Sequence, residues 1–256
     1  MPTKPLDKGG LYFEELGSCF EDWISKYDVE RRANLIKIFL STIDISGRTC
    51  LEVGCGTGKI SEAINHLFDQ YVASDISEKL ARGVGERLGL DWMQLDACNM
   101  DITTGTYDVV ISSECIEHTG NPQKALSEMA RILKARGTII VTSPNRLWYP
   151  VLWASIAARI RKFHGSEKWL FPWKAASILR ACGITDIRIS GCHLFPWQAP
   201  FARHVLPSFD KFGRFLYFAM VNYVIYGRKS ENYFHTEENK NGQITIGKSV
   251  NSDTSF

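Results

Sequence analysis

Several features that are common in other protein classes are missing from this 256-residue sequence. No apolar run reaches the roughly 18 residues of a membrane-spanning helix, and the first ten residues lack the apolar core of a signal peptide. The seven cysteines are scattered and form no Cys-x-x-Cys pair, so their spacing indicates neither a zinc site nor a disulfide framework. We therefore expect buried thiols in a reducing compartment, and a cytoplasmic protein.

One segment of the sequence, residues 50–59, has glycine at alternate positions and reads Cys-Leu-Glu-Val-Gly-Cys-Gly-Thr-Gly-Lys. An apolar run precedes it and a helical pattern follows, which predicts a strand, a turn and a helix. Glycine has no Cβ, so such a turn lets a ligand touch the main chain. The spacing is not the G-x-G-x-x-G of dinucleotide folds, and no Lys-Ser/Thr pair follows as in a phosphate-binding loop. The carboxylate of Glu52 favours a cationic ligand over a pyrophosphate.

The pattern Glu52-x-Gly54-x-Gly56-x-Gly58 resembles the first motif of class I S-adenosylmethionine (SAM)-dependent methyltransferases. The resemblance covers about residues 30–228. It implies SAM as the cofactor, held at this motif by Glu52, Gly54, Cys55, Gly56 and Gly58. It also implies an α/β, Rossmann-like fold: a seven-stranded, mostly parallel sheet with helices on both faces, an antiparallel last strand and aromatic cap insertions.

Two further acids follow predicted strands. Asp75 ends the strand predicted at 70–75, about 20 residues after the glycines, where a carboxylate can bind a ribose diol beside Ile76. The other interpretation of Asp75 is a turn residue before the helix that Ser77 starts. In methyltransferases that this chain resembles, an acid at Asp96, next to Ala97, faces the adenine amino group; the alternative is an ordinary loop aspartate.

The run from Tyr107 to Glu114 predicts a buried strand and resembles the family's fourth motif. The resemblance places the residues after the strand, including Ser113, beside the sulfonium of SAM. The Asp/Asn-Pro-Pro-Tyr/Phe sequence of amino-group nucleic-acid methyltransferases is absent. The chain therefore lacks that family's clamp for an exocyclic base amine.

The segment Glu114-Cys-Ile-Glu117-His118 is the sharpest chemical signal after the glycines. On a helical turn these two carboxylates and the imidazole share one face. That arrangement predicts either a divalent-metal site formed by Glu114, Glu117 and His118, or a general base, His118, with an orienting acid, Glu117. The pattern resembles the Glu-x-x-Glu-His of ubiquinone-biosynthesis O-methyltransferases and of a small-RNA 2′-O-methyltransferase family, which implies Mg²⁺. A third interpretation is that Glu117 and His118 only brace the turn.

The chain divides into three parts by composition. Residues 1–48 are expected to form a helical cover, with helix over 20–43 and an apolar stripe at its centre. Residues 49–229 are expected to form the methyltransferase domain that the resemblance implies, with strands near 49–53, 70–75, 91–95, 106–112, 137–143, 184–190 and 220–228. Residues 230–256 are polar and are expected to be disordered. Arg31 and Arg32 can reach the SAM carboxylate, although the interpretation we favour is a solvated surface role.

Charge is distributed unevenly. Residues 1–143 hold 15 Lys and Arg against 21 Asp and Glu, whereas residues 144–229 hold 13 against 3 and are rich in aromatic side chains. Two cap insertions, about 144–172 and 193–217, concentrate these residues. The stretch 146–162 combines tryptophans with terminal cations, which suits a helix in a membrane interface. The alternatives are a cap helix packed on the core and, with less support, a single-stranded nucleic-acid surface.

Taken together, these patterns predict a SAM-dependent methyltransferase that transfers a methyl group to an oxygen of an apolar or lipid-linked small molecule, met at the cytoplasmic face of a membrane. Three alternatives stay open: an RNA or other nucleic-acid methyltransferase, a non-catalytic SAM-binding protein, and a non-SAM α/β nucleotide enzyme, which the missing phosphate motif disfavours. The sequence does not indicate an oligomeric state.

Overall fold

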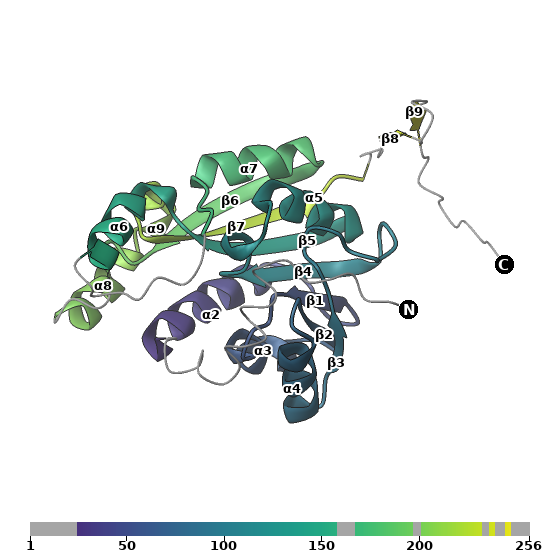
Figure 1. Ribbon diagram of the computed structural model, residues 1–256, viewed down its shortest axis with the longest axis horizontal. Coiled ribbons are helices and arrows are strands. Elements are labelled where there is room, and N and C mark those ends of the chain that lie inside the picture. The colour runs from purple at the N-terminus through teal and green to yellow at the C-terminus, as the bar shows by residue number, and fades with distance from the viewer. Residues whose placement is uncertain (1–24, 158–166, 197–200, 232–235, 239–243, 247–256) are drawn as a thin grey trace.

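A computed structural model of the chain describes residues 25–157, 167–196, 201–231, 236–238 and 244–246. Seven strands form one sheet in the order β3-β2-β1-β4-β5-β7-β6 (Figure 1). They are β1 (Thr49–Val53), β2 (Gln70–Asp75), β3 (Asp91–Gln94), β4 (Tyr107–Ser113), β5 (Leu133–Pro144), β6 (Ile184–Cys192) and β7 (Asn222–Lys229). Neighbouring strands are parallel except around β7, which is antiparallel to both β5 and β6. The predicted Rossmann-like class is confirmed.

Helices cover both faces of this sheet. On one face lie α2 (Lys26–Leu40), α3 (Lys59–Ile64) and α4 (Glu78–Leu88); on the other lie α5 (Pro122–Ile132) and α7 (Pro172–Ala181) (Figure 1). Each face has its own apolar core, because every buried strand presents alternate side chains to opposite sides. On β4, for example, Val110 packs in the core under α5 and α7, while Val109 and Ile111 pack under α2 and α3.

Local sequence sets several helix boundaries. The side chains of Ser77 and Asn121 accept hydrogen bonds from the first turns of α4 and α5, which is the role of an N-cap. Gly89 and Gly183 have φ of +67° and +79° at the C-terminal ends of α4 and α7, where a left-handed residue ends a helix without a Cβ penalty. Of the helix expected over 20–43, the structure shows α2, which spans Lys26–Leu40. Positions 20–24 lie outside the described residues.

The two cap insertions lie together at one end of the molecule (Figure 1). The first contains the 3₁₀ turn η4 (Arg146–Trp148) and α6 (Tyr149–Ala157), and the second contains α8 (Ala202–Asp210) and α9 (Gly213–Leu216). Two further 3₁₀ turns are η2 (Asn65–Leu67) and η3 (Ile116–His118). No helix in the described part of the chain is long and apolar enough to cross a membrane.

The structure describes two short segments of the tail that is expected to be disordered. β8 (Thr236–Glu238) and β9 (Ile244–Ile246) pair as antiparallel strands. Both contain β-branched residues, which favour extended backbone. The other tail residues after 231 lie outside the described part of the chain.

Candidate functional site

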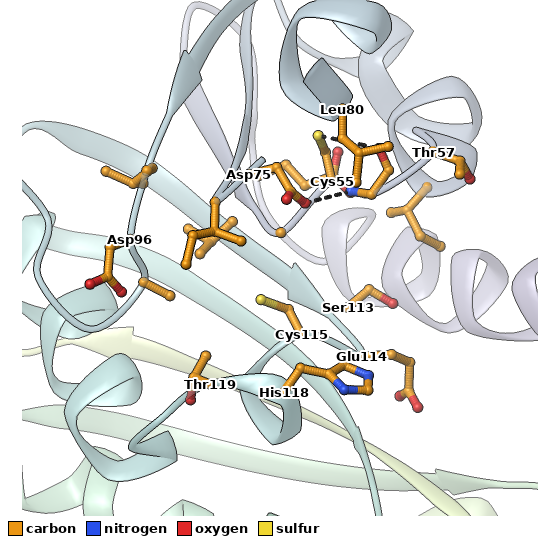
Figure 2. A pocket seen from close by; sticks show the side chains of 18 of the residues that line it. Cys55, Thr57, Asp75, Leu80, Asp96, Ser113, Glu114, Cys115, His118 and Thr119 are labelled. Carbon is orange, nitrogen blue, oxygen red and sulfur yellow. Dashed lines mark hydrogen bonds between the residues drawn. The ribbon is translucent and has the colours of Figure 1, made fainter. Parts of the chain in front are cut away.

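A cavity of about 380 Å³ opens at the C-terminal ends of β1, β2, β3 and β4 (Figure 2). Side chains that follow four strands meet there because parallel strands end at the same edge of a sheet. Figure 2 shows Cys55, Thr57 and Asp75 along one side and Cys115, His118 and Thr119 across from them. This volume is in the range of small-molecule and cofactor sites.

The glycine loop after β1 is a sharp turn in which all three glycines have positive φ: +76° at Gly54, +53° at Gly56 and +80° at Gly58. The amides of Gly54 and Cys55 both donate to the carbonyl of Ser74, which fixes the turn against the end of β2. A Cβ on Gly54 would lie 2.3 Å from the Cys115 sulfur. Glycine is therefore required here both for backbone conformation and for space.

Glu52 lies on the floor of the cavity and is almost fully buried. Its carboxylate accepts hydrogen bonds from the hydroxyls of Ser61 on α3 and Tyr71 on β2. Burial raises the pKa of Glu52 to about 7, with these two hydrogen bonds opposing the shift and the Asp75 charge adding to it. Glu52 thus holds α3 and β2 around the loop and places negative charge, when ionised, at the base of the site.

Asp75, the last residue of β2, is buried at the cavity wall. Its two carboxylate oxygens accept hydrogen bonds from the amides of Gly56 (2.9 Å) and Ser77 (3.0 Å). Burial raises the pKa of Asp75, against these backbone hydrogen bonds. A carboxylate has about four lone-pair sites, so each oxygen retains the capacity to accept another hydrogen bond from a ligand.

The cavity brings together nine of the ten residues expected to bind the cofactor. They are Glu52, Gly54, Cys55, Gly56, Asp75, Ile76, Asp96, Ala97 and Ser113. Gly58 is not among the lining residues, because it precedes the first residue of α3 and packs against Val84 on α4. Asp96 is exposed, and its carboxylate accepts the Cys98 amide at 2.8 Å.

Thr57, a lining residue that sequence reasoning missed, has a buried hydroxyl without a hydrogen-bond partner in the described part of the chain. A buried polar atom of this kind is normally satisfied, so this hydroxyl fits a ligand in the cavity. The position inside the glycine motif was the only signal in the sequence.

A second missed feature is a buried network that begins on α2. The Arg32 guanidinium donates to the Asp28 carboxylate at 3.0 and 2.8 Å and to the Ser113 hydroxyl at 2.7 Å, and it lines the cavity. The other Asp28 oxygen lies 3.0 Å from Nε2 of the fully buried His193. The surface role favoured for Arg32 is therefore wrong: the spacing of four residues on one helix pairs it with Asp28 and points it inward.

The charges in this network stabilise one another. Burial alone would raise the pKa of Asp28. The charges and hydrogen bonds of Arg32 and His193 lower it by more than burial raises it, so the net shift is downward. Burial lowers the pKa of Arg32, and the Asp28 and Glu114 carboxylates raise it above its ordinary value. The Arg32 guanidinium is consequently held as a permanent cation at the cavity wall, which suits a ligand carboxylate.

The residue after β4, Glu114, has a φ of +52°, which is unusual for a residue with a side chain. Its carboxylate accepts hydrogen bonds from Thr142 (3.0 Å) and Asn222 (2.8 Å), and it lines the cavity. Burial raises the pKa of Glu114, with Arg32 opposing the shift. The strands β5 and β7 thus hold this carboxylate in place.

The expected metal site is not supported by the geometry. The helical turn that would align Glu114, Glu117 and His118 starts only at Ile116, since Glu114 is left-handed. Glu117 is buried outside the cavity lining, where it accepts a hydrogen bond from Ser143 on β5 at 3.2 Å. No group of three or more His, Cys, Asp or Glu side chains in the described ranges is arranged to hold a metal ion. The described residues at this position therefore do not fit a Mg²⁺ ion.

His118 is half-buried at the cavity wall and does face the interior (Figure 2). Among the lining side chains four are Asp or Glu and two are Arg or Lys, Arg32 and Lys59. The excess of carboxylates favours a ligand with positive charge, and Arg32 gives that ligand a place for one negative group. Such an arrangement can bind a nucleoside that carries both positive charge and one negative group, and it places that ligand beside the His118 imidazole.

The segment that carries this site is similar to segments of known proteins. The family model described as "Methyltransferase domain" matches residues 51–141, which carry the glycine loop, Asp75, Asp96 and the end of β4. The chain is 27% identical over 168 residues to a protein of Xanthomonas oryzae named "Ubiquinone biosynthesis O-methyltransferase", covering 61% of this chain and 70% of that protein. A protein of the same name from Nitrosococcus oceani is 25% identical over 199 residues, covering 73% and 79%.

Solved structures share the fold at lower identity. A SAM-dependent methyltransferase of Thermotoga maritima superposes with a TM-score of 0.63 at 18% identity, covering 86% of this chain and 99% of that one. Phosphoethanolamine N-methyltransferase 2 of Haemonchus contortus, solved with S-adenosyl-L-methionine, gives 0.57 at 18% identity, covering 78% and 52%. At this identity the likeness concerns the fold alone.

Proposed function

We propose that this chain is a class I SAM-dependent methyltransferase and that it methylates an oxygen atom of an apolar or lipid-linked small molecule. The observation that carries the proposal is the cavity itself, in which the glycine loop and Asp75 face His118 across a space of about 380 Å³. Oxygen as the acceptor atom is supported by the similarity to proteins named "Ubiquinone biosynthesis O-methyltransferase".

Four groups would hold SAM in this cavity. Asp75 would accept hydrogen bonds from the ribose diol with the lone pairs that its backbone donors leave available. Arg32 would bind the carboxylate, Asp96 would face the adenine amino group, and the Thr57 hydroxyl would find its missing partner. When bound, SAM supplies an electrophilic methyl group on a sulfonium.

The protein's own contribution would be orientation and proton transfer. The lining of strand ends is rigid, and holding the acceptor in line with the methyl group is worth a large effective concentration. His118 would accept the acceptor's hydroxyl proton, since its ring faces the cavity and histidine is the side chain that most often acts as a general base. Glu117 would act only through the 3₁₀ turn that carries His118, because its own carboxylate is bonded to Ser143.

The decisive experiment is transfer of tritiated methyl from SAM by the purified chain into separated lipid, RNA and small-molecule pools. Label in an alkali-stable methyl ether, or in a methyl ester that alkali releases as methanol, in the lipid or small-molecule pool supports the proposal. Label in RNA would instead establish the nucleic-acid alternative. Cofactor binding without label in any pool would establish a non-catalytic SAM-binding protein.

A further inference from the structure

Four phenylalanines recur every third residue along α8, α9 and the segment after it. Their side chains are 39–74% exposed, although phenylalanine is normally buried. We call this set, Phe209, Phe212, Phe215 and Phe218, the phenylalanine stripe. The amides of Phe212 and Phe215 donate to the carbonyls of Phe209 and Phe212, so these residues follow one another at intervals of one turn. Large apolar side chains gathered and exposed in this way indicate an interaction site.

The stripe is not required for the fold of its own helices, because another face of the same segment attaches them to the core. Leu206 is fully buried, and the Asp210 carboxylate accepts hydrogen bonds from Arg31 on α2 and from the His193 amide. Gly213 is so close to the sheet that a Cβ there would lie 2.2 Å from the Gly191 carbonyl oxygen. The anchored face and the exposed stripe are therefore separate faces of the same segment.

The first cap insertion extends this apolar surface. The Trp148 indole donates to the Ala219 carbonyl at 2.9 Å, and the Asn145 amide donates to the Phe218 carbonyl at 2.9 Å. These bonds join η4 to the end of the stripe. Beyond η4, α6 exposes Val151 and Trp153, and η4 itself exposes Leu147. The helices α6, α8 and α9 of the two insertions thus lie at the same end of the molecule (Figure 1).

Among residues 201–230, all of which the structure describes, the stripe is accompanied by exposed cations and by no exposed acid. Lys211 and Arg214 are exposed between the phenylalanines. Asp210 is buried in its pair with Arg31, and Glu231, after β7, pairs with Arg136. A surface that combines exposed aromatic rings with cations complements the headgroups and acyl boundary of an anionic bilayer.

We propose that the phenylalanine stripe, with Lys211 and Arg214, docks this protein on an anionic lipid surface. A second copy of the chain is a poorer occupant, because a symmetric dimer through this face would oppose like charges. Docking on lipid would bring a lipid-linked acceptor to the enzyme, and that role of the stripe rests on the proposed function. The evidence for docking is this surface alone. It differs from the membrane contact expected at 146–162, of which residues 158–162 lie outside the described part of the chain.

The test is sedimentation of the full chain with vesicles of phosphatidylcholine alone or with about 30% phosphatidylglycerol. We expect binding to the anionic vesicles that weakens as salt is raised. The double variant Phe212→Ser/Phe215→Ser should lower the partition coefficient at least about tenfold. Lys211→Gln/Arg214→Gln should lower binding to the anionic vesicles only. The matched control is Ile38→Ser, which removes an exposed apolar side chain from α2.

Three results would overturn the proposal. The wild-type chain could fail to bind anionic vesicles at low salt, or Ile38→Ser could lose as much binding as the stripe variant. Analytical ultracentrifugation could reveal a dimer that depends on Phe212 and Phe215 in a protein that does not bind vesicles. A second copy of the chain would then be the occupant of this surface. Calorimetry with SAM on each folded variant keeps the two proposals distinct, because vesicle binding requires no cofactor and cofactor binding requires no vesicle.

Discussion

The Arg31 guanidinium on α2 binds the Asp210 carboxylate on α8 through two hydrogen bonds, of 2.9 and 2.5 Å, across 179 positions of sequence. The next residue, Arg32, reaches into the cavity. One turn of α2 therefore connects the cofactor site with the helix that carries the exposed phenylalanines. The second Asp210 oxygen accepts the His193 amide, so one buried carboxylate joins three segments.

Removing Asp210 should destabilise the protein more than removing Arg31. Asp210→Ala leaves a buried amide and an arginine without their acceptor, and we expect a loss of about 2 kcal/mol in the free energy of unfolding. Arg31→Ala should cost less, because the Arg31 side chain is 27% exposed and its pair is partly screened. Urea denaturation of both variants and of the double variant measures the coupling. Strictly additive effects would contradict the pairing.

Gly54→Ala should abolish cofactor binding and lower the melting temperature. The added Cβ meets the Cys115 sulfur at 2.3 Å in a backbone with φ of +76°, so we expect a loss of more than about 2 kcal/mol in stability. The control is Gly83→Ala on α4, where the new Cβ meets nothing within 4 Å and helix propensity should stabilise the protein slightly. Equal melting temperatures for the two variants would refute the close packing of the loop.

Asp75→Ala should weaken SAM binding by more than about tenfold, because the loss of two ribose hydrogen bonds to a charged acceptor exceeds 1.4 kcal/mol. Isothermal titration calorimetry with SAM provides the measurement. Asp101→Ala, at an exposed aspartate outside the cavity, should bind as the wild type does. An unchanged dissociation constant for Asp75→Ala would remove the ribose assignment.

His118→Ala should reduce kcat by about a hundredfold or more while SAM affinity changes little, as expected for a general base. Exposed His66 on η2 offers the matched substitution, His66→Ala, which should leave both quantities unchanged. Steady-state kinetics with the acceptor found by methyl labelling, together with calorimetry, separate the two effects. If SAM affinity fell and kcat did not, His118 would be a binding or structural residue.

Glu52 should make the protein less stable as pH rises. Its pKa is about 7 when folded and about 4.5 when unfolded, so between these values the folded state binds more protons and stability falls with increasing pH. The full difference corresponds to about 3 kcal/mol. Thermal unfolding of Glu52→Gln between pH 5 and about pH 8 should therefore show a weaker decline than the wild type. The exposed Glu78→Gln serves as control, and an unaltered pH profile in Glu52→Gln would argue against a protonated buried carboxylate.

Most of the fold could be predicted because its signals are local. β1 and β2 begin and end where their apolar runs predict, and Ser77 and Gly183 mark helix ends through their own capping chemistry. The cavity lining was predictable for a related reason: residues directly after parallel strands share one edge of the sheet. The buried position of Arg32 was missed because one helical spacing fits a surface ion pair and a buried one equally well.

The His118 region shows the limit of spacing arguments. The pattern at 114–118 predicts convergence only if its backbone is helical, but the left-handed Glu114 directs one carboxylate to β5 and β7 while Glu117 bonds to Ser143. No local signal reports that strain, since it is imposed by partners that lie about 30 and 110 positions away in the chain, at Thr142 and Asn222.

The sequence by itself determined the order of strands and helices, the glycine turn and the acids at the strand ends, because these depend on backbone conformation and short-range periodicity. Only the tertiary structure decided which charges are buried together, which carboxylates face the cavity and which phenylalanines remain in water. Those outcomes depend on desolvation and on contacts between segments distant in the chain, and neither is encoded within a single window of sequence.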